Sequence, residues 1–233
     1  MSVAEIPVHQ ASYVVKLEDS KGFRQEWFVV QKIGFENQEN IPDNIEKAFQ
    51  RGDLGLLPRG GVASLISSSG DHQYTQGKAF CFLPLPFKTG LPVHINGHFA
   101  LNHEDRRNLW RDDKGDYRSN WNDALIRQVV APCYVTLLDE VRQHISLPRD
   151  ANGKTYIKGD KDRGENVLSN YLDLFPINVN ARESYWTVLC KEVYCHMNVQ
   201  ALPLLPVLRQ ENKGKKTKKK RGRVAASNRK RSY

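Results

Sequence analysis

The last 22 residues constrain the fold most, because they cannot take part in a hydrophobic core. From Asn212 to Tyr233 the chain carries eleven lysines and arginines, no acidic residue and no large apolar residue before the final tyrosine. Such a segment buries too little apolar surface to offset the conformational entropy lost on ordering. We therefore expect a disordered basic tail over 210–233 and a folded body over 1–209. A subdivision of the body is left open at 147–166, a charged loop with three glycines.

The net charge of +9 belongs to this tail. Eleven of the 35 basic residues lie there, which leaves 24 basic against 26 acidic residues for positions 1–211. The body should not attract nucleic acid, whereas the tail could do so through salt-sensitive phosphate contacts or could serve as a nuclear import signal. The candidate tail residues are Lys215, Lys216, Lys218, Lys219, Lys220, Arg221 and Arg223.

The remaining composition favours a cytoplasmic protein, with a nuclear location left open by the tail. No apolar run reaches the roughly 20 residues that span a bilayer, and the N-terminus lacks the pattern of a secretory signal. We therefore expect no membrane partner. The cysteines Cys81, Cys133, Cys190 and Cys195 contain no Cys-x-x-Cys pair, so we expect reduced, buried thiols. A zinc site from Cys190, Cys195 and His196 is the alternative, but its spacing fits no common zinc pattern.

Hydrophobic patterning predicts an α+β fold, with antiparallel strands and hairpins in the N-terminal half and a mainly helical C-terminal half. A hairpin is expected over 11–35, with a return strand buried on both faces. A turn at 57–61 should lead into a strand or short helix at 62–66. A strand over 78–85, ended by Pro84 and Pro86, should pair with a strand over 93–101 as a hairpin with a wide loop.

Helices are expected at five places. Two carry specific start or stop signals. The helix at 103–110 should begin after an Asn102 cap, and the long helix over 121–145 should begin after Asn120 and kink at Pro132. The others are a short helix at 45–49, one at 167–175 stopped by Pro176, and one at 183–200. One apolar cluster should join the strands to the long helix, and it comprises Phe82, Leu83, Phe99, Trp110, Trp121 and Leu125.

Two constellations could bind a ligand. His94, Asn96 and His98 alternate along a strand and should share one face. They could support a metal or acid–base site, although a structural hydrogen-bond network is favoured. Arg106, Arg107 and Arg111 surround Trp110 and could grip a carboxylate or phosphate beside a stacking ring. The alternative is a packed aromatic with arginines around it.

No sequence motif of a self-contained active site is present. Gly60-Gly61 lacks the other residues of a phosphate loop and is interpreted as a turn. Neither a serine nucleophile elbow nor a kinase signature occurs. We therefore expect no enzyme activity and no cofactor.

The segment 77–101 resembles the internal repeat of the sacsin family. The resemblance continues through the paired arginines and Trp110, then Trp121-Asn122, and it also covers 57–63 and 131–135. It extends over roughly 50–145 strongly and over the flanks weakly.

This resemblance implies a chaperone-related scaffold whose repeats are similar to the ATP-binding and middle regions of ATP-driven heat-shock chaperones. The Glu-x-x-x-Asn-Ala-x-Asp-Ala and Asp-x-Gly-x-Gly motifs of the nucleotide pocket are absent here, as is the His-Pro-Asp tripeptide of a J domain. The expected function is thus a non-catalytic module that follows the nucleotide pocket. Its implied partners are a neighbouring ATP-binding domain, the heat-shock chaperone system and protein clients. The alternative is an RNA- or chromatin-associated protein that works through its tail.

Overall fold

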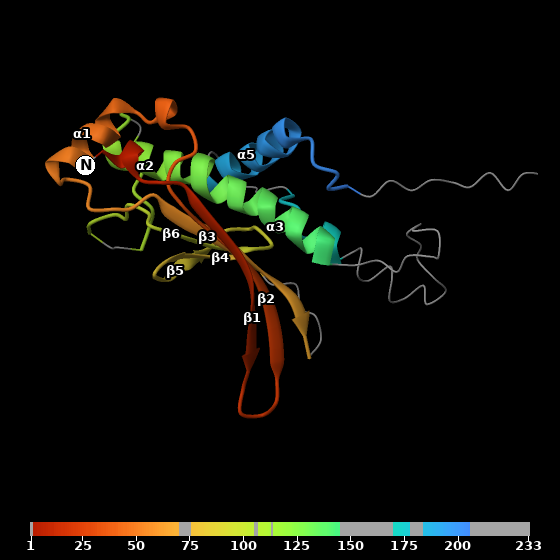
Figure 1. Ribbon diagram of the computed structural model, residues 1–233. Helices are drawn as coiled ribbons and strands as arrows, with labels where there is room; N and C mark the ends of the chain where they lie inside the picture. Colours follow the sequence, from red (N-terminus) through yellow and green to blue (C-terminus); the bar gives the residue numbers. More distant parts are fainter. Residues whose placement is uncertain are drawn as a thin grey trace, which may run out of the picture.

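The structure is a computed structural model that describes residues 2–69, 76–104, 107–112, 114–144, 170–177 and 184–205. Its centre is one six-stranded sheet in the order β1-β2-β3-β6-β4-β5, with the long helices packed on one face (Figure 1). The predicted α+β class is confirmed. The tail and the region 147–166 lie outside the described residues, so their expected behaviour stays a prediction. The strands are β1 (His9–Glu18), β2 (Arg24–Ile33), β3 (Arg59–Ser68), β4 (Lys78–Cys81), β5 (Leu83–Lys88) and β6 (His94–Gly97).

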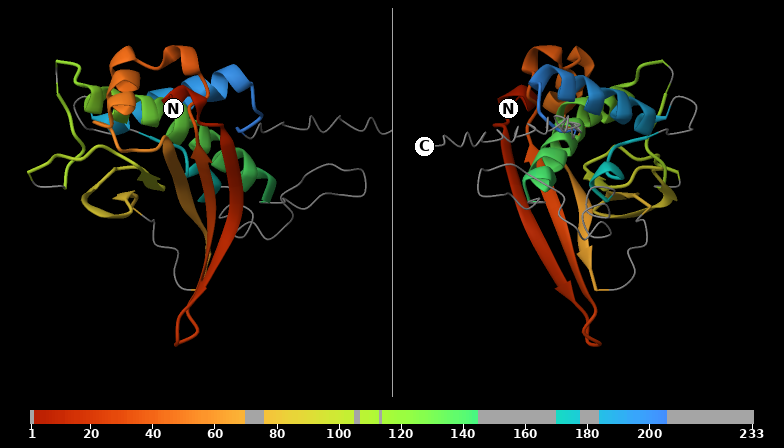
Figure 2. Two further views of the ribbon diagram at one scale, coloured as in Figure 1. Left: turned by 60° about the vertical axis from the view of Figure 1, so that its left-hand side comes forward. Right: turned by 90° about the vertical axis from the view of Figure 1, so that its right-hand side faces the viewer.

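The first hairpin is confirmed, and its tip extends well beyond the helices (Figure 2). Asp19 closes the turn, because its Oδ1 accepts hydrogen bonds from the backbone N–H groups of Lys21 at 2.8 Å and Phe23 at 2.9 Å. In β2, Phe28, Val30 and Lys32 are buried while the residues between them are only half-buried. The prediction that this strand is buried on both faces is therefore wrong.

The segment after residue 77 differs from the expected long strand. The chain reverses at Phe82, whose φ is +62°, and β4 and β5 pair as a tight antiparallel hairpin. Pro84 and Pro86 lie inside β5 rather than ending a strand. They are tolerated because β5 is the last strand of the sheet and has a neighbouring strand on one side only.

The expected pairing of 78–85 with 93–101 as a wide hairpin is also wrong. β6 lies parallel to β4 and antiparallel to β3, so the chain passes over β4 between β5 and β6. The described part of 103–110 forms no helix. Asn102 instead accepts a hydrogen bond from the N–H of Glu104 at 3.0 Å, and an isolated bridge joins Leu101 to Leu109.

The helices otherwise follow the predicted pattern, with revised ends. The expected long helix is three consecutive pieces: α2 (Tyr117–Leu125), the π-helical turn η3 (Ile126–Val130) and α3 (Ala131–His144). It begins at Tyr117, after Asp116 and not after Asn120. The wide turn precedes Pro132, which has no N–H for the normal helical bond. The other helices are α1 (Asp43–Arg51), α5 (Tyr185–Gln200) and the short 3-10 helices η1 (Val3–Glu5) and η2 (Gln38–Asn40); residues 170–172 are also helical.

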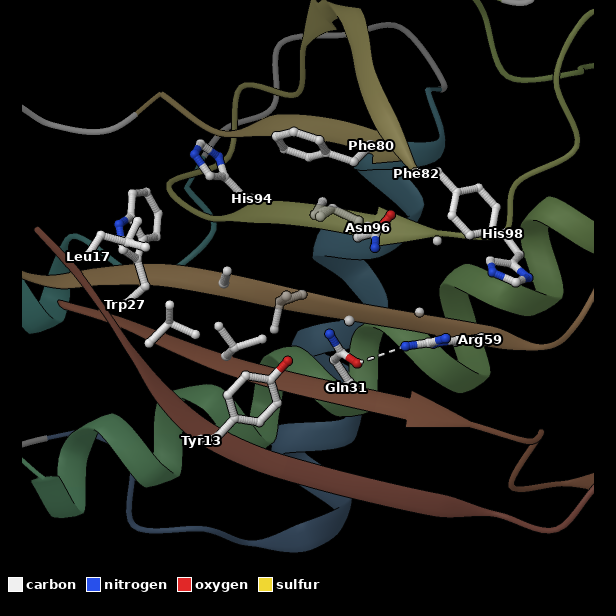
Figure 3. Close-up of a pocket in the computed structure, with 18 residues that line it drawn as sticks. Tyr13, Leu17, Trp27, Gln31, Arg59, Phe80, Phe82, His94, Asn96 and His98 are labelled. Carbon is white, nitrogen blue, oxygen red and sulfur yellow. Dashed lines mark hydrogen bonds between the residues drawn. The ribbon is translucent and has the colours of Figure 1, made fainter. Parts of the chain in front are cut away.

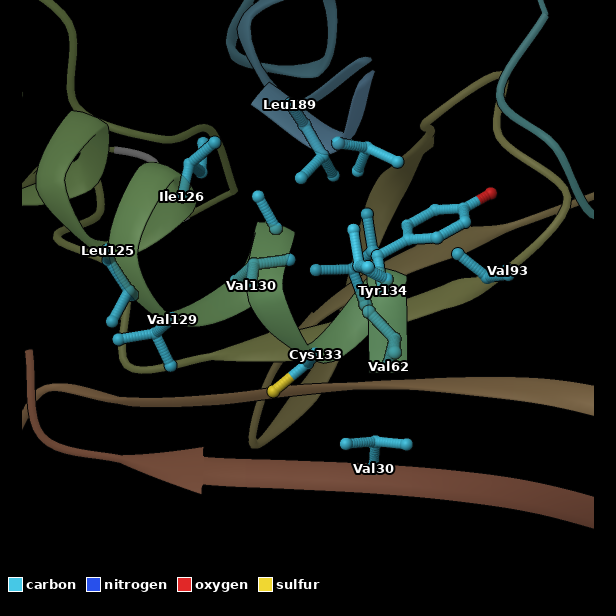
Figure 4. Close-up of a cluster of buried hydrophobic side chains, with 14 of the residues drawn as sticks. Val30, Val62, Val93, Leu125, Ile126, Val129, Val130, Cys133, Tyr134 and Leu189 are labelled. Atoms are coloured by element: carbon cyan, nitrogen blue, oxygen red, sulfur yellow. The ribbon is translucent and has the colours of Figure 1, made fainter. Parts of the chain in front are cut away.

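The core lies between the sheet and the helices. Side chains of η3 and α3, such as Val129, Val130 and Cys133, lie between Val62 of the sheet and Leu189 of α5 (Figure 4). None of the helices in the described part of the chain is long and apolar enough to cross a membrane.

The predicted core cluster is half right. Phe99, Trp121 and Leu125 are buried, and Trp110 is partly buried against the core. Phe82 and Leu83 are 71% and 74% exposed, because they form the reversal of the β4–β5 hairpin rather than the middle of a strand.

Replacing Trp121 with alanine should destabilise the protein strongly. The ring is fully buried, and its Nε1–H donates to the carbonyl of His98 at 2.8 Å. Removing a large buried aromatic costs about 3–5 kcal/mol. The denaturant midpoint should therefore fall clearly for Trp121→Ala and barely change for Val199→Ala, since Val199 is 82% exposed. An unchanged midpoint for Trp121→Ala would contradict the packing described here.

Candidate functional site

A bowl opens on the face of the sheet opposite the long helices (Figure 3). Its volume is about 460 Å³, and residues of β1, β2, β3, β4 and β6 line it. Cavities of this size are typical of sites that hold a small molecule or a few side chains of a partner. We call this surface the bowl, and its principal side chains are Tyr13, Trp27, Arg59, Ala63, Phe80 and Phe82, with Gly61 and Asn96 at its floor.

The bowl forms because the central strand β3 carries only small side chains at the middle of that face. Along β3, Val62 and Ser64 are buried toward the helices, so Arg59, Gly61 and Ala63 face the bowl. A Cβ at Gly61 would lie only 2.5 Å from the carbonyl oxygen of Val30, so this position accepts only glycine without a backbone shift. Glycine followed by alanine on the middle strand thus leaves a hollow between larger neighbours.

Adjacent Gly60 serves the other face of the sheet. A Cβ there would meet the methyl groups of Val130 and Val129 at 3.2 and 3.3 Å. Because Gly60 has no Cβ, η3 can approach the sheet closely. The Gly60-Gly61 pair is therefore part of β3, and its interpretation as a turn is wrong.

Aromatic side chains form the walls of the bowl. The register places Tyr13 opposite Val29, Val29 opposite Ala63, and Ala63 opposite His94, in one row across the sheet. Trp27 stacks on His94 with centroids 5.0 Å apart and planes 20° apart.

The β4–β5 hairpin supplies the opposite wall. Phe80 meets His94 edge-on at 5.6 Å, and the exposed ring of Phe82 lies 4.6 Å from His98. Together the two walls make a bowl that is mainly apolar.

His94 is held as a neutral imidazole. Its Nδ1 accepts a hydrogen bond from the backbone N–H of Lys78 at 3.1 Å, which leaves the proton on Nε2. Burial, and then the positive charge of Lys78, lower the pKa of His94 below its usual value. His94 therefore adds no positive charge to the bowl at neutral pH.

Arg59 is the charged residue of the bowl lining. Its Nη2 donates to Oε1 of Gln31 at 3.2 Å, as the dashed line in Figure 3 marks. The backbone N–H of His98 donates to the carbonyl of Arg59 at 3.0 Å, which holds the two residues side by side. Burial first, and the nearby arginine second, lower the pKa of His98.

The three residues predicted to share a face do so, since His94, Asn96 and His98 all line the bowl. The hydrogen bond of His94 fits the structural interpretation. Within the described residues, no group of three or more His, Cys, Asp or Glu side chains is placed to hold a metal.

The predicted arginine cluster is described only in part. Arg106 lies outside the described residues, Arg107 and Arg111 are exposed, and Trp110 is half-buried. The guanidinium of Arg111 lies 5.8 Å from the centre of the Tyr185 ring, and that of Arg118 lies 4.9 Å from the Trp110 ring. A partner contact at these residues stays a prediction.

The thiols divide by burial. Cys133 is buried, and burial raises its pKa to about 12; Cys190 is half-buried, and burial raises its pKa to about 11. Cys81 is also half-buried, with a raised pKa. Cys195 is exposed, so the expectation of four buried thiols is wrong.

Sequence reasoning missed most of the bowl. The sequence predicts a hairpin that contains Tyr13 and Trp27, but it does not indicate which face of the sheet their side chains occupy. It also predicts a turn at Gly61. The signal that could have revealed the bowl is the alternation of Arg59, Gly61 and Ala63 in β3, next to β6 and the residue that follows it, which place two histidines on one face. That pattern becomes readable only when β3 and β6 are known to be neighbours.

Acid should weaken the fold through the bowl histidines. The unfolded chain takes up a proton on each near the ordinary histidine pKa of about 6.5, whereas the folded chain resists protonation. This contribution is therefore fully present above that pH and is lost as the pH falls. The free energy of unfolding should be lower at pH 5.5 than at 7.5, and His94→Gln should reduce the difference while His9→Gln, at an exposed site, should not. Equal pH dependence in native protein and His94→Gln would refute this assignment.

No family model and no solved structure matches the chain. Among curated proteins, human sacsin is 37% identical to it over 210 residues. The match covers 89% of this chain but only 4% of sacsin, so the chain spans a small part of the relative's length. It extends beyond the region of strong resemblance and includes most of the residues that build the sheet, the bowl and the helical layer. The chain is thus related to the sacsin family over most of its length.

Proposed function

We propose that this chain is a non-catalytic binding module of a chaperone-related scaffold, and that it holds apolar segments of client proteins in the bowl. The observation that carries the proposal is the bowl itself, an apolar hollow with aromatic walls on a sheet face that no described element covers. Exposed apolar surfaces of this kind commonly mark binding sites.

The relation to sacsin supports the same class of function. The resemblance to its repeat implies work beside an ATP-binding domain and the heat-shock chaperone system, in the cytoplasm. The nucleotide-pocket motifs are absent from this sequence. We therefore propose that the module contributes binding and that any ATP-driven step belongs to a partner.

The test is suppression of aggregation of a heat-denatured reporter enzyme. Ala63→Phe fills the bowl from the floor and should abolish suppression, because Ala63 faces the bowl and not the core. Gln38→Phe adds the same ring at an exposed position on η2 and should leave suppression intact. Suppression should not require ATP, and calorimetry with ATP and magnesium should show no saturable heat.

Two results would count against the proposal. Unchanged suppression by Ala63→Phe, with an unchanged circular dichroism spectrum, would place client binding elsewhere. Saturable ATP binding by the isolated chain would contradict the proposal that the module binds clients without binding ATP itself.

A second function rests on the tail, which carries eleven positive charges in 22 residues and no acidic residue. We propose RNA, chromatin or an import receptor as its partner. Truncation after Leu208 should remove RNA binding, and binding by the full chain should fall steeply between two salt concentrations because phosphate contacts release counterions. Undiminished RNA binding by the truncated chain would move the site into the nearly neutral body.

A further inference from the structure

The bowl lining carries positive charge and no negative charge. Arg59 is a fixed positive charge, and none of the residues that line the bowl is acidic. The two histidines of the lining have lowered pKa values and stay neutral near pH 7. A ligand that matched this surface would therefore be apolar and would carry one negative charge.

The guanidinium of Arg59 has N–H donors available for a ligand. Among the described residues its side chain bonds the neutral amide of Gln31 and forms no ion pair with a carboxylate. A guanidinium offers five N–H donors in a planar fork, and two parallel ones match a carboxylate. The hydrogen bond to Gln31 orients the group without neutralising it.

Phe82 gives the Arg59 end of the bowl an aromatic edge. Its φ of +62° is unusual for a bulky residue and strains the backbone, yet its ring is 71% exposed. The ring contacts His98, whose N–H is bonded to the Arg59 carbonyl. An exposed aromatic ring in a strained turn, next to the bowl cation, is arranged as a contact surface.

We propose that the bowl recognises a protein segment in which a large apolar side chain adjoins a carboxylate, with the side chain over Gly61 and Ala63 and the carboxylate on Arg59. This inference rests on the proposed client-binding function and deepens it by naming the chemistry of the bound segment. A volume of about 460 Å³ suits one or two large side chains as an anchor.

The surface favours a peptide over other anions. One arginine matches one carboxylate, whereas a polyphosphate needs several cations. Residues that line the bowl, such as Tyr13, Arg59 and Phe82, are exposed, so a peptide can keep its polar backbone in water while a side chain is buried.

The test uses a fluorescent peptide that ends in Leu-Phe with a free carboxylate, and the same peptide as its C-terminal amide. Anisotropy with the full chain should show saturable binding, about tenfold tighter for the acid, as one charge-assisted hydrogen bond predicts. Arg59→Gln should remove the preference for the acid. Arg51→Gln, an exposed arginine on α1 far from the bowl lining, should retain it, and Ala63→Phe should weaken both peptides.

Several outcomes would overturn the inference. These are no binding of either peptide, equal affinity of acid and amide, an acid preference that survives in Arg59→Gln, or binding that Ala63→Phe leaves unchanged. Competition by decanoate as effective as that by the acid peptide would identify a fatty acid as the ligand instead. Aggregation suppression measured in parallel separates the two proposals, because suppression without peptide binding would leave client binding standing and refute only the carboxylate specificity.

Discussion

A pair of neighbouring side chains, Trp121 and Asn122, ties the helical layer to the sheet. The indole N–H of Trp121 donates to the His98 carbonyl at 2.8 Å. The buried amide of Asn122 accepts from the N–H of Ala100 at 2.8 Å and donates to the carbonyls of Ala100 and Trp110 at 2.9 and 3.0 Å. The bond to the N–H of Ala100 satisfies a buried backbone donor, and leaving such a group unpaired would cost about 1–3 kcal/mol. Because His98 is bonded in turn to Arg59, the same clamp fixes one end of the bowl.

The two faces of the sheet depend on opposite uses of small residues. On the helical face, Gly60 lets Val129 and Val130 approach the strand, and the wide turn of η3 accommodates Pro132 in the same helical run. On the open face, Gly61 and Ala63 leave a hollow that no described side chain fills. Small residues on adjacent positions of one strand therefore serve close packing on one face and an open hollow on the other.

Local patterns predicted the elements whose signals are contiguous in the sequence. The first hairpin has a clear turn at Asp19, and α5 has a regular apolar stripe through Trp186, Leu189 and Val193 behind a Ser184 cap. The order of β4, β5 and β6 was not predictable, because the reversal falls on Phe82, a residue that strongly disfavours positive φ. Phe82 and Leu83 therefore read as core although both are exposed.

The bowl was hidden from sequence reasoning for a related reason. Its side chains come from five strands, and their meeting depends on a strand order that no local signal specifies. Only the shared face of His94, Asn96 and His98 followed from alternation alone. Trp27 and Tyr13 line the bowl only because β1 and β2 pair with each other and β2 pairs with β3.

The prolines of β5 limit how this sheet can associate with others. Pro84 and Pro86 give the β5 edge two residues that have no backbone donor, while β1 presents ten residues without a proline at the other edge. A sheet that can be extended at both edges can polymerise head to tail, whereas one with a single open edge is capped after one pairing. The prolines therefore disfavour β5 as a pairing edge and favour association of two copies through β1 over growth into a fibre.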